Sequence, residues 1–286
     1  MEAGRGDPLL FLHGWGLTPR SYGDAVVRLC AAGVRVIAPA LPGAGGSSPL
    51  PLRAGLTAYA ERVGRLLDVL DLPRSPFVAG HSLGGGIALR LAHDRPELVR
   101  SLTLVNTVGG RPDRAGGLVG GGLDWLRWVG SAASELDPRE WLAPHVAPQV
   151  LRDLLPTLAR RPWRALATGI VALSANLAEE AQGLVAAGVP VLYVWGDRDR
   201  LATPGVLADA AGELGPEVVR GRHGWMLTEP AEFAGVIHDA LVVHAMLERQ
   251  RRGQQLPGAS RPGGPTAPMV LPPGASLADL FPPAAR

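Results

Sequence analysis

Ten residues, FVAGHSLGGG at positions 77–86, constrain the fold of this chain more than any other stretch. An apolar run (residues 77–79) leads into the turn GHSLG, and an alanine- and leucine-rich segment at helical spacing follows. This pattern predicts a strand, a sharp turn and a helix. Glycine is needed two positions before and after the serine, because a Cβ at either position would keep the strand and the helix apart.

Ser82 stands at the apex of this turn. We expect its hydroxyl to project above the sheet edge at the N-terminus of the next helix, where free amides favour negative charge. Because glycine and serine are common, the pattern by itself is also compatible with a plain glycine-rich turn. The context described below favours the functional interpretation, and Ser82 is our candidate nucleophile.

The rest of the chain alternates between expected strands and expected helices. The strand candidates are short, mainly apolar runs that each lead into a loop: residues 9–12, 34–38, 77–79, 102–105 and 189–195. Segments with apolar residues at helical spacing, such as residues 56–70, separate the early strand candidates. Such alternation predicts an α/β fold with a mostly parallel central sheet and helices on both faces. Functional side chains are then expected at the carboxyl ends of the strands.

The strand rhythm stops between residues 109 and 187, where helical pieces are broken by proline. We predict a helical cap there (109–187), inserted between two parts of the core (1–108 and 188–250). Trp125, Trp128 and Trp141 lie in this segment, and with Trp15 they are our candidates for lining an apolar substrate pocket. The alternative, that the tryptophans only pack the cap against the core, stays open.

Residues 251–286 contain eight prolines and five glycines in 36 residues, which predicts a disordered tail. Elsewhere no apolar run approaches the ~20 residues of a membrane span. The start, MEAGRGD, does not resemble a signal peptide, so a cytoplasmic protein is expected. The formal charge is +2 with scattered arginines, which argues against a nucleic-acid surface. The oligomeric state is left open.

Three residue types needed for nucleophilic catalysis occur in a suitable order along the chain. After Ser82, acidic residues follow the strand at 189–195, and His223 lies in a loop after a short last strand expected at 217–220. A serine hydroxyl becomes nucleophilic when a histidine takes its proton, and a carboxylate must orient that histidine. Spacing permits either Asp197 or Asp199 as the carboxylate.

An oxyanion also needs amide donors, one from the residue after the nucleophile and one from a loop after an earlier strand. Leu83 follows the serine, and the sequence HGWG at residues 13–16 ends the first strand. We therefore expect the amides of Leu83 and Trp15 to form the oxyanion hole.

Five motifs together resemble the α/β-hydrolase superfamily, in its cap-bearing, esterase-like branch: HGWG, ALPGAGGSS, GHSLGGG, WGDRDRLATP and RHGWMLTEPAEF. The resemblance implies Asp199 as the triad acid, with Asp197 as the alternative, and His223 as the histidine. In one respect the chain departs from this family. Two strands usually precede the one that ends in HG, whereas eight residues precede Leu9, so the leading edge strands are expected to be missing.

We therefore predict a serine hydrolase that acts on a small apolar ester or related acyl substrate through a covalent acyl-enzyme. Two alternatives remain open: a carbon–carbon bond hydrolase with the same triad, and a non-catalytic ligand-binding protein on a hydrolase fold. No cofactor and no metal are expected, because the sequence has neither a ligand cluster with metal spacing nor a glycine-rich phosphate loop.

Overall fold

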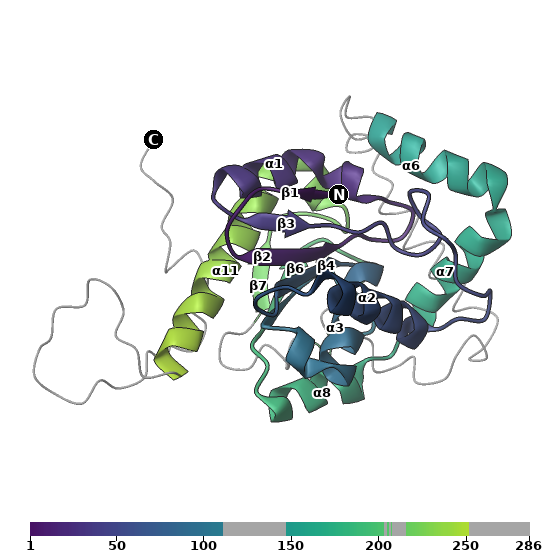
Figure 1. Cartoon of the computed structure of the whole chain (residues 1–286). Coiled ribbons are helices and arrows are strands. Elements are labelled where there is room, and N and C mark those ends of the chain that lie inside the picture. Colours follow the sequence, from purple (N-terminus) through teal and green to yellow (C-terminus); the bar gives the residue numbers. More distant parts are fainter. Residues whose placement is uncertain (111–146, 203–204, 206, 208–215, 252–286) are drawn as a thin grey trace, which may run out of the picture.

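A computed structural model describes residues 1–110, 147–202, 205, 207 and 216–251. Its centre is a seven-stranded sheet in the order β1-β3-β2-β4-β5-β6-β7, in which every neighbouring pair except β1–β3 is parallel (Figure 1). The predicted α/β fold with a mostly parallel sheet is thereby confirmed. The strands are β1 (Glu2–Ala3), β2 (Pro8–Leu12), β3 (Arg35–Ile37), β4 (Phe77–His81), β5 (Ser101–Val105), β6 (Val191–Gly196) and β7 (Pro216–Val219).

Helices cover both faces of the sheet (Figure 1). One face carries α1 (Gly23–Ala31) and α11 (Pro230–Arg251), which contact each other. The other face carries α2 (Leu56–Leu70), α3 (Leu83–Asp94) and α8 (Ala178–Ala187), with α3 packed between its two neighbours. The remaining described helices are η1 (Pro19–Tyr22), η2 (Pro96–Leu98), α6 (Ala147–Arg160), α7 (Pro162–Ser174) and α10 (Trp225–Thr228).

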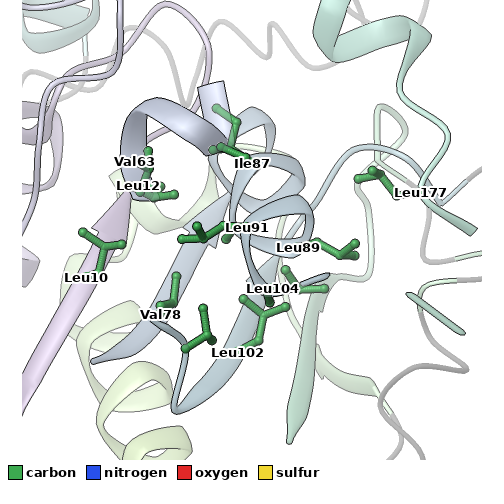
Figure 2. Packing of buried hydrophobic residues seen from close by; sticks show 14 of the residues in the cluster. Leu10, Leu12, Val63, Val78, Ile87, Leu89, Leu91, Leu102, Leu104 and Leu177 are labelled. Carbon is green, nitrogen blue, oxygen red and sulfur yellow. The ribbon is translucent and has the colours of Figure 1, made fainter. Parts of the chain in front are cut away.

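Successive side chains of the central strands point to opposite faces of the sheet and pack into two separate hydrophobic clusters. In β2, Leu9 and Phe11 face α1 and α11, whereas Leu10 and Leu12 face α2 and α3. Figure 2 shows the second cluster, with strand side chains such as Leu10 and Val78 directed toward Leu91 of α3. Because both faces of the sheet are covered, all five residues of β2 (PLLFL) are buried and apolar. The sequence therefore shows a continuous apolar run instead of an alternation of apolar and polar residues.

The leading edge of the sheet carries one short strand. In β1, Glu2 and Ala3 pair antiparallel with Ile37 and Val36 of β3, and an Arg35–Glu2 ion pair lies across the same edge. The sequence leads us to expect no leading edge strand, and the structure has the two-residue β1 at this edge. Two residues are too few for periodicity to reveal, and the strand depends on its pairing with β3.

In the described residues between β5 and β6, the regular elements are all helices. They are α6 and α7, and then α8, which packs beside α3 on the face of the sheet. The candidates Trp125, Trp128 and Trp141 lie outside the described residues, as does the tail from residue 252 onward. In the part of the chain that is described, no helix is both long enough and apolar enough to cross a bilayer.

Candidate active site

The turn between β4 and α3 holds Ser82 in the left-handed region, at φ 54°. Few residues other than glycine adopt this conformation, and it stores strain that the surrounding packing must maintain. The flanking glycines allow this packing. A Cβ on Gly80 would lie 2.5 Å from the Gly84 carbonyl oxygen, and a Cβ on Gly84 would lie 2.2 Å from the Leu12 carbonyl oxygen. Both glycines are thus required for the close approach that the sequence predicted.

Three side chains from distant parts of the chain meet at the carboxyl edge of the sheet. Nε2 of His223 lies 2.9 Å from Oγ of Ser82, and Nδ1 of His223 lies 2.8 Å from Oδ2 of Asp199. An ionised carboxylate can only accept a hydrogen bond, so Nδ1 carries the proton and Nε2 is left to accept from the serine hydroxyl. This is the arrangement in which a histidine can take the serine proton.

The structure distinguishes the two candidate carboxylates by their contacts. The Asp199 side chain is fully buried, and its Oδ1 accepts hydrogen bonds from the amides of Leu201 (2.8 Å) and Ala202 (2.9 Å). Asp197 is exposed and accepts from the amide of Gly221 at 2.9 Å. Of the two, Asp199 contacts the imidazole, whereas Asp197 contacts the backbone of the loop that carries His223.

His13 fixes the loop that carries Trp15. Its Nδ1 donates to the carbonyl of Gly14 and its Nε2 accepts from the amide of Leu41, both at 2.9 Å. Burial lowers the pKa of His13 to about 4, so the ring is neutral at neutral pH, as these two bonds require. The loop after β2 is thereby tied to the loop after β3.

The two expected oxyanion donors belong to segments that adjoin Ser82. Leu83 is the first residue of α3, where a helix amide has no acceptor within its own helix. The HGWG loop passes close by, since a Cβ on Gly14 would lie 3.5 Å from Cβ of Ser82. The Trp15 indole donates to the carbonyl of Ala165 in α7 at 2.9 Å, so this loop also contacts the helices above the sheet.

A mainly apolar cavity adjoins Trp15 and Leu83. It lies between the loops of the core and the helices α6 and α7, and its apolar lining includes Leu17, Leu41, Leu52, Leu154 and Val171. One cation, Arg164 of α7, also lines it and donates to the carbonyl of Leu50 at 2.7 Å. Trp163, the fourth tryptophan of the predicted cap, is 74% exposed and is not among the lining residues. Sequence reasoning missed the aliphatic lining, because leucine and valine carry no signal that separates core from pocket.

Asn106 and His81 are the polar residues at this edge whose contacts sequence reasoning missed. Asn106 directly follows β5 at φ 44°, and its side chain contacts the backbone of Arg222, His223 and Gly196. A polar residue at the end of an apolar strand, beside the serine turn, is the signal that could have identified it. His81, the residue before the serine, is buried and bonds to Tyr22 and to the carbonyl of His223.

Burial, together with the neighbouring His223, holds the pKa of His81 well below its usual value. His81 is therefore neutral at this position and adds no positive charge beside His223. Among the described residues, no three histidine, cysteine, aspartate or glutamate side chains are grouped as a metal site would require.

A mostly parallel sheet covered on both faces, with a strained serine turn after its central strand, is typical of the α/β-hydrolase class. The sequence profile of the alpha/beta hydrolase family matches residues 9–236. The chain belongs to this family and is an enzyme of the α/β-hydrolase class.

Two curated proteins that are similar to this chain carry the names of different activities. A pimeloyl-[acyl-carrier protein] methyl ester esterase of Aromatoleum aromaticum is 35% identical over 197 residues, which are 64% of this chain and 69% of the relative. A protein of Mycobacterium phage D29, named as a non-heme haloperoxidase, is 26% identical over 253 residues, or 84% of this chain and 89% of the relative. Two further relatives are longer than the matched region. The chain spans 56% of the dihydrolipoyllysine-residue acetyltransferase component of the acetoin cleaving system of Cupriavidus necator and 31% of a protein of Mycobacterium bovis.

Solved structures share the fold. The crystal structure of the enol-lactonase from Burkholderia xenovorans LB400 superimposes with a TM-score of 0.65 at 22% identity, covering 85% of this chain and 95% of the lactonase. At this level of identity the likeness concerns the fold alone.

Proposed function

We propose that this protein is a serine hydrolase that cleaves a small apolar ester or related acyl substrate through a covalent acyl-enzyme. Ser82 is the nucleophile, His223 the general base and acid, and Asp199 the residue that orients the imidazole. The amides of Trp15 and Leu83 stabilise the oxyanion.

The observation that carries this proposal is the pair of hydrogen bonds made by His223, at 2.9 Å to Ser82 and 2.8 Å to Asp199. As Oγ bonds to the substrate carbonyl carbon, its proton passes to Nε2. The imidazolium then gives this proton to the leaving alcohol, and an ester of Ser82 remains. Water attacks that ester with the same base, and the acid is released as Ser82 regains its proton.

The apolar cavity beside Trp15 and Leu83 supports an apolar acyl group as the substrate portion held next to the oxyanion. We further propose that residues 109–187 include the cap over this site. Its described helices α6 and α7 contribute Leu154, Ala165 and Val171 to the cavity, whereas α8 packs on the sheet beside α3. Trp15 is the proposed substrate contact among the described tryptophans.

The first test is covalent labelling with a fluorophosphonate probe, which reacts with activated serines. We expect the wild-type protein to be labelled and Ser82→Ala to be unlabelled. Ser101→Ala is the matched control, because Ser101 is also buried but lies at the amino end of β5, at the opposite edge of the sheet. Labelling that survives in Ser82→Ala would refute the assignment of the nucleophile.

Substrate class is tested by turnover. The wild-type protein should hydrolyse short p-nitrophenyl esters, and Ser82→Ala should not. Preferential cleavage of vinylogous diketones would instead identify a carbon–carbon bond hydrolase. Ligand-induced thermal stabilisation without turnover, over a broad ester panel, would identify a non-catalytic binding protein.

A further inference from the structure

We propose that Asn106 and His81 are positioning residues, which hold the backbone of His223 so that its imidazole spans Ser82 and Asp199. This inference rests on the proposed function, because it concerns the same site. Neither residue is assigned contact with the substrate; both act through the histidine.

Two buried side-chain donors converge on one backbone atom, the carbonyl oxygen of His223. Nδ2 of Asn106 lies 3.0 Å from it and Nε2 of His81 lies 3.1 Å from it. Asn106 is fully buried and His81 is 3% exposed. The donors come from the ends of β5 and β4, whereas His223 lies in the loop after β7, the last strand of the sheet. The histidine loop is therefore anchored directly to the strands that surround the serine turn.

The Asn106 side chain is itself fixed from both ends. Its Oδ1 accepts from the amide of Gly196, the last residue of β6, at 2.9 Å. Its Nδ2 also donates to the carbonyl of Arg222 at 3.1 Å, and its own backbone amide donates to Val194 at 2.9 Å. Asparagine is one of the few non-glycine residues that tolerate the φ of 44° found here. Asn106 thus joins β5, β6 and the histidine loop.

His81 belongs to a chain of hydrogen bonds with a defined direction. The carbonyl of His223 can only accept, so Nε2 of His81 carries the proton, and Nδ1 of the neutral ring accepts from the Tyr22 hydroxyl at 2.7 Å. The Tyr22 oxygen in turn accepts from the amide of Gly14 at 3.2 Å. The loop that carries Trp15 is therefore connected to the loop that carries His223 through two buried rings.

Such anchoring has a catalytic consequence because His223 must satisfy two partners at once. A displacement of about 1 Å in a catalytic group can cost about 100-fold in rate. The backbone of His223 is held by atoms that the reaction leaves unchanged, so the imidazole keeps its place while its proton moves. Loss of these anchors should lower kcat with little effect on KM.

Asn106→Asp tests this with a nearly isosteric change. A carboxylate keeps the acceptor for Gly196, but it lacks the donor and repels the two carbonyls of the histidine loop. At pH 8 we expect kcat for a p-nitrophenyl ester to fall by at least about tenfold and KM to stay within about twofold. Asn176→Asp is the matched control: Asn176, the other asparagine of the chain, is exposed and caps the amide of Ala178. It should retain wild-type kinetics.

The pH profile supplies a readout that a purely structural defect would not move. A carboxylate beside His223 favours the protonated imidazole, so the acidic limb of kcat/KM should shift to higher pH in Asn106→Asp. Asp199 and His81, the titratable groups that contact His223, are unchanged in this variant. Asn176→Asp should show no shift.

Substitutions of His81 give independent evidence, and they decide the matter if Asn106→Asp does not fold. His81→Leu removes the donor to His223, whereas His81→Gln keeps an amide donor at about the position of Nε2. We expect the leucine variant to lose at least about tenfold in kcat and the glutamine variant to recover most of it.

The proposal is overturned if folded Asn106→Asp and His81→Leu both keep wild-type kcat and pH profile. It is also overturned if His81→Gln is as impaired as His81→Leu. These outcomes differ from a failure of the proposed function, in which the wild-type protein shows no Ser82-dependent turnover or labelling at all.

Discussion

The loops at the carboxyl edge of the sheet and the helices above them differ in how they are held. In the loops, His13, Asn106 and Asp199 are almost completely buried, and each is tied to another loop: His13 and Asn106 bond to its backbone, and Asp199 bonds to the imidazole of His223. The helices α6 and α7 carry large apolar side chains that are at least half exposed: Leu151, Leu155, Trp163 and Leu166.

These helices also make polar contacts with the core. Asp153 of α6 accepts from the hydroxyls of Thr18 (2.7 Å) and Ser21 (2.5 Å), and Trp15 donates to Ala165 of α7. We infer that the proposed chemistry depends on buried, well-bonded loops of the core, whereas the shape of the cavity depends on the more exposed helices α6 and α7. Changes in the loops should therefore affect kcat and folding, and changes in α6 should mainly affect KM.

The largest effect is expected from Asp199→Asn. The asparagine oxygen can still accept from Leu201 and Ala202, but its NH2 group faces Nδ1 of His223 and favours the wrong tautomer. We expect kcat to fall about 10⁴-fold, as in serine proteases after the equivalent change.

The matched control is Asp197→Asn, in the same loop, which should stay within about threefold of the wild-type kcat because Asp197 is exposed and does not contact the imidazole. Steady-state kinetics on a p-nitrophenyl ester distinguish the two variants. An equal loss in both would contradict the assignment of the carboxylate.

A large effect on stability is expected from Gly84→Ala. The new Cβ would lie 2.2 Å from the carbonyl oxygen of Leu12, and backbone atoms would have to move to relieve the overlap. We expect a loss of about 3 kcal/mol or more in the free energy of unfolding, measured by denaturant titration.

Gly235→Ala provides the comparison, because Gly235 is also helical but its Cβ would meet open space. That variant should gain about 0.5–1 kcal/mol from helix propensity. A tolerated alanine at position 84 would mean that the serine turn is less tightly packed than the contacts around it indicate.

The smallest effect is expected from Asp153→Ala. Loss of its bonds to Thr18 and Ser21 should loosen α6 and raise KM by about threefold to tenfold, with kcat within about twofold, since each such bond contributes about 1 kcal/mol. Arg152→Ala removes an exposed side chain from the neighbouring position of α6 and should leave KM unchanged. A loss in kcat without a change in KM would show that α6 supports the loops instead of the cavity.

The sheet and its serine turn could be predicted because their signals are local. Apolar runs such as residues 9–12 and 77–79 have the length of buried strands. The motif GHSLG is typical of a sharp turn between a strand and a helix. Ser82 and His223 were chosen as candidate catalytic residues by residue type, order and resemblance. The choice between Asp199 and Asp197 could not be made from spacing, because two residues within one turn differ only in the direction of their side chains.

Other features of the site lacked any local signal. The strand β1 has two residues and exists through its pairing with β3, so no periodicity could reveal it. Asn106 stands at the end of an apolar strand with no motif around it, and its contacts reach Gly196 of β6 and the loop that carries Arg222 and His223. The cavity lining beyond Trp15 is largely aliphatic, and aliphatic residues look alike in a core and in a pocket.

By itself, the sequence determined the order of strands and helices and the turn at Ser82, because hydrophobic periodicity and the steric demands of glycine act between neighbouring residues. Spacing left two carboxylates open and the resemblance favoured Asp199, whereas the tertiary structure shows which carboxylate faces His223. The donors that hold the backbone of His223 and the side chains that line the cavity were decided by the tertiary structure alone. Those relations join atoms up to 150 positions apart along the chain, as in the contact of Trp15 with Ala165. They arise only when parallel strands bring their carboxyl ends to one edge of the sheet.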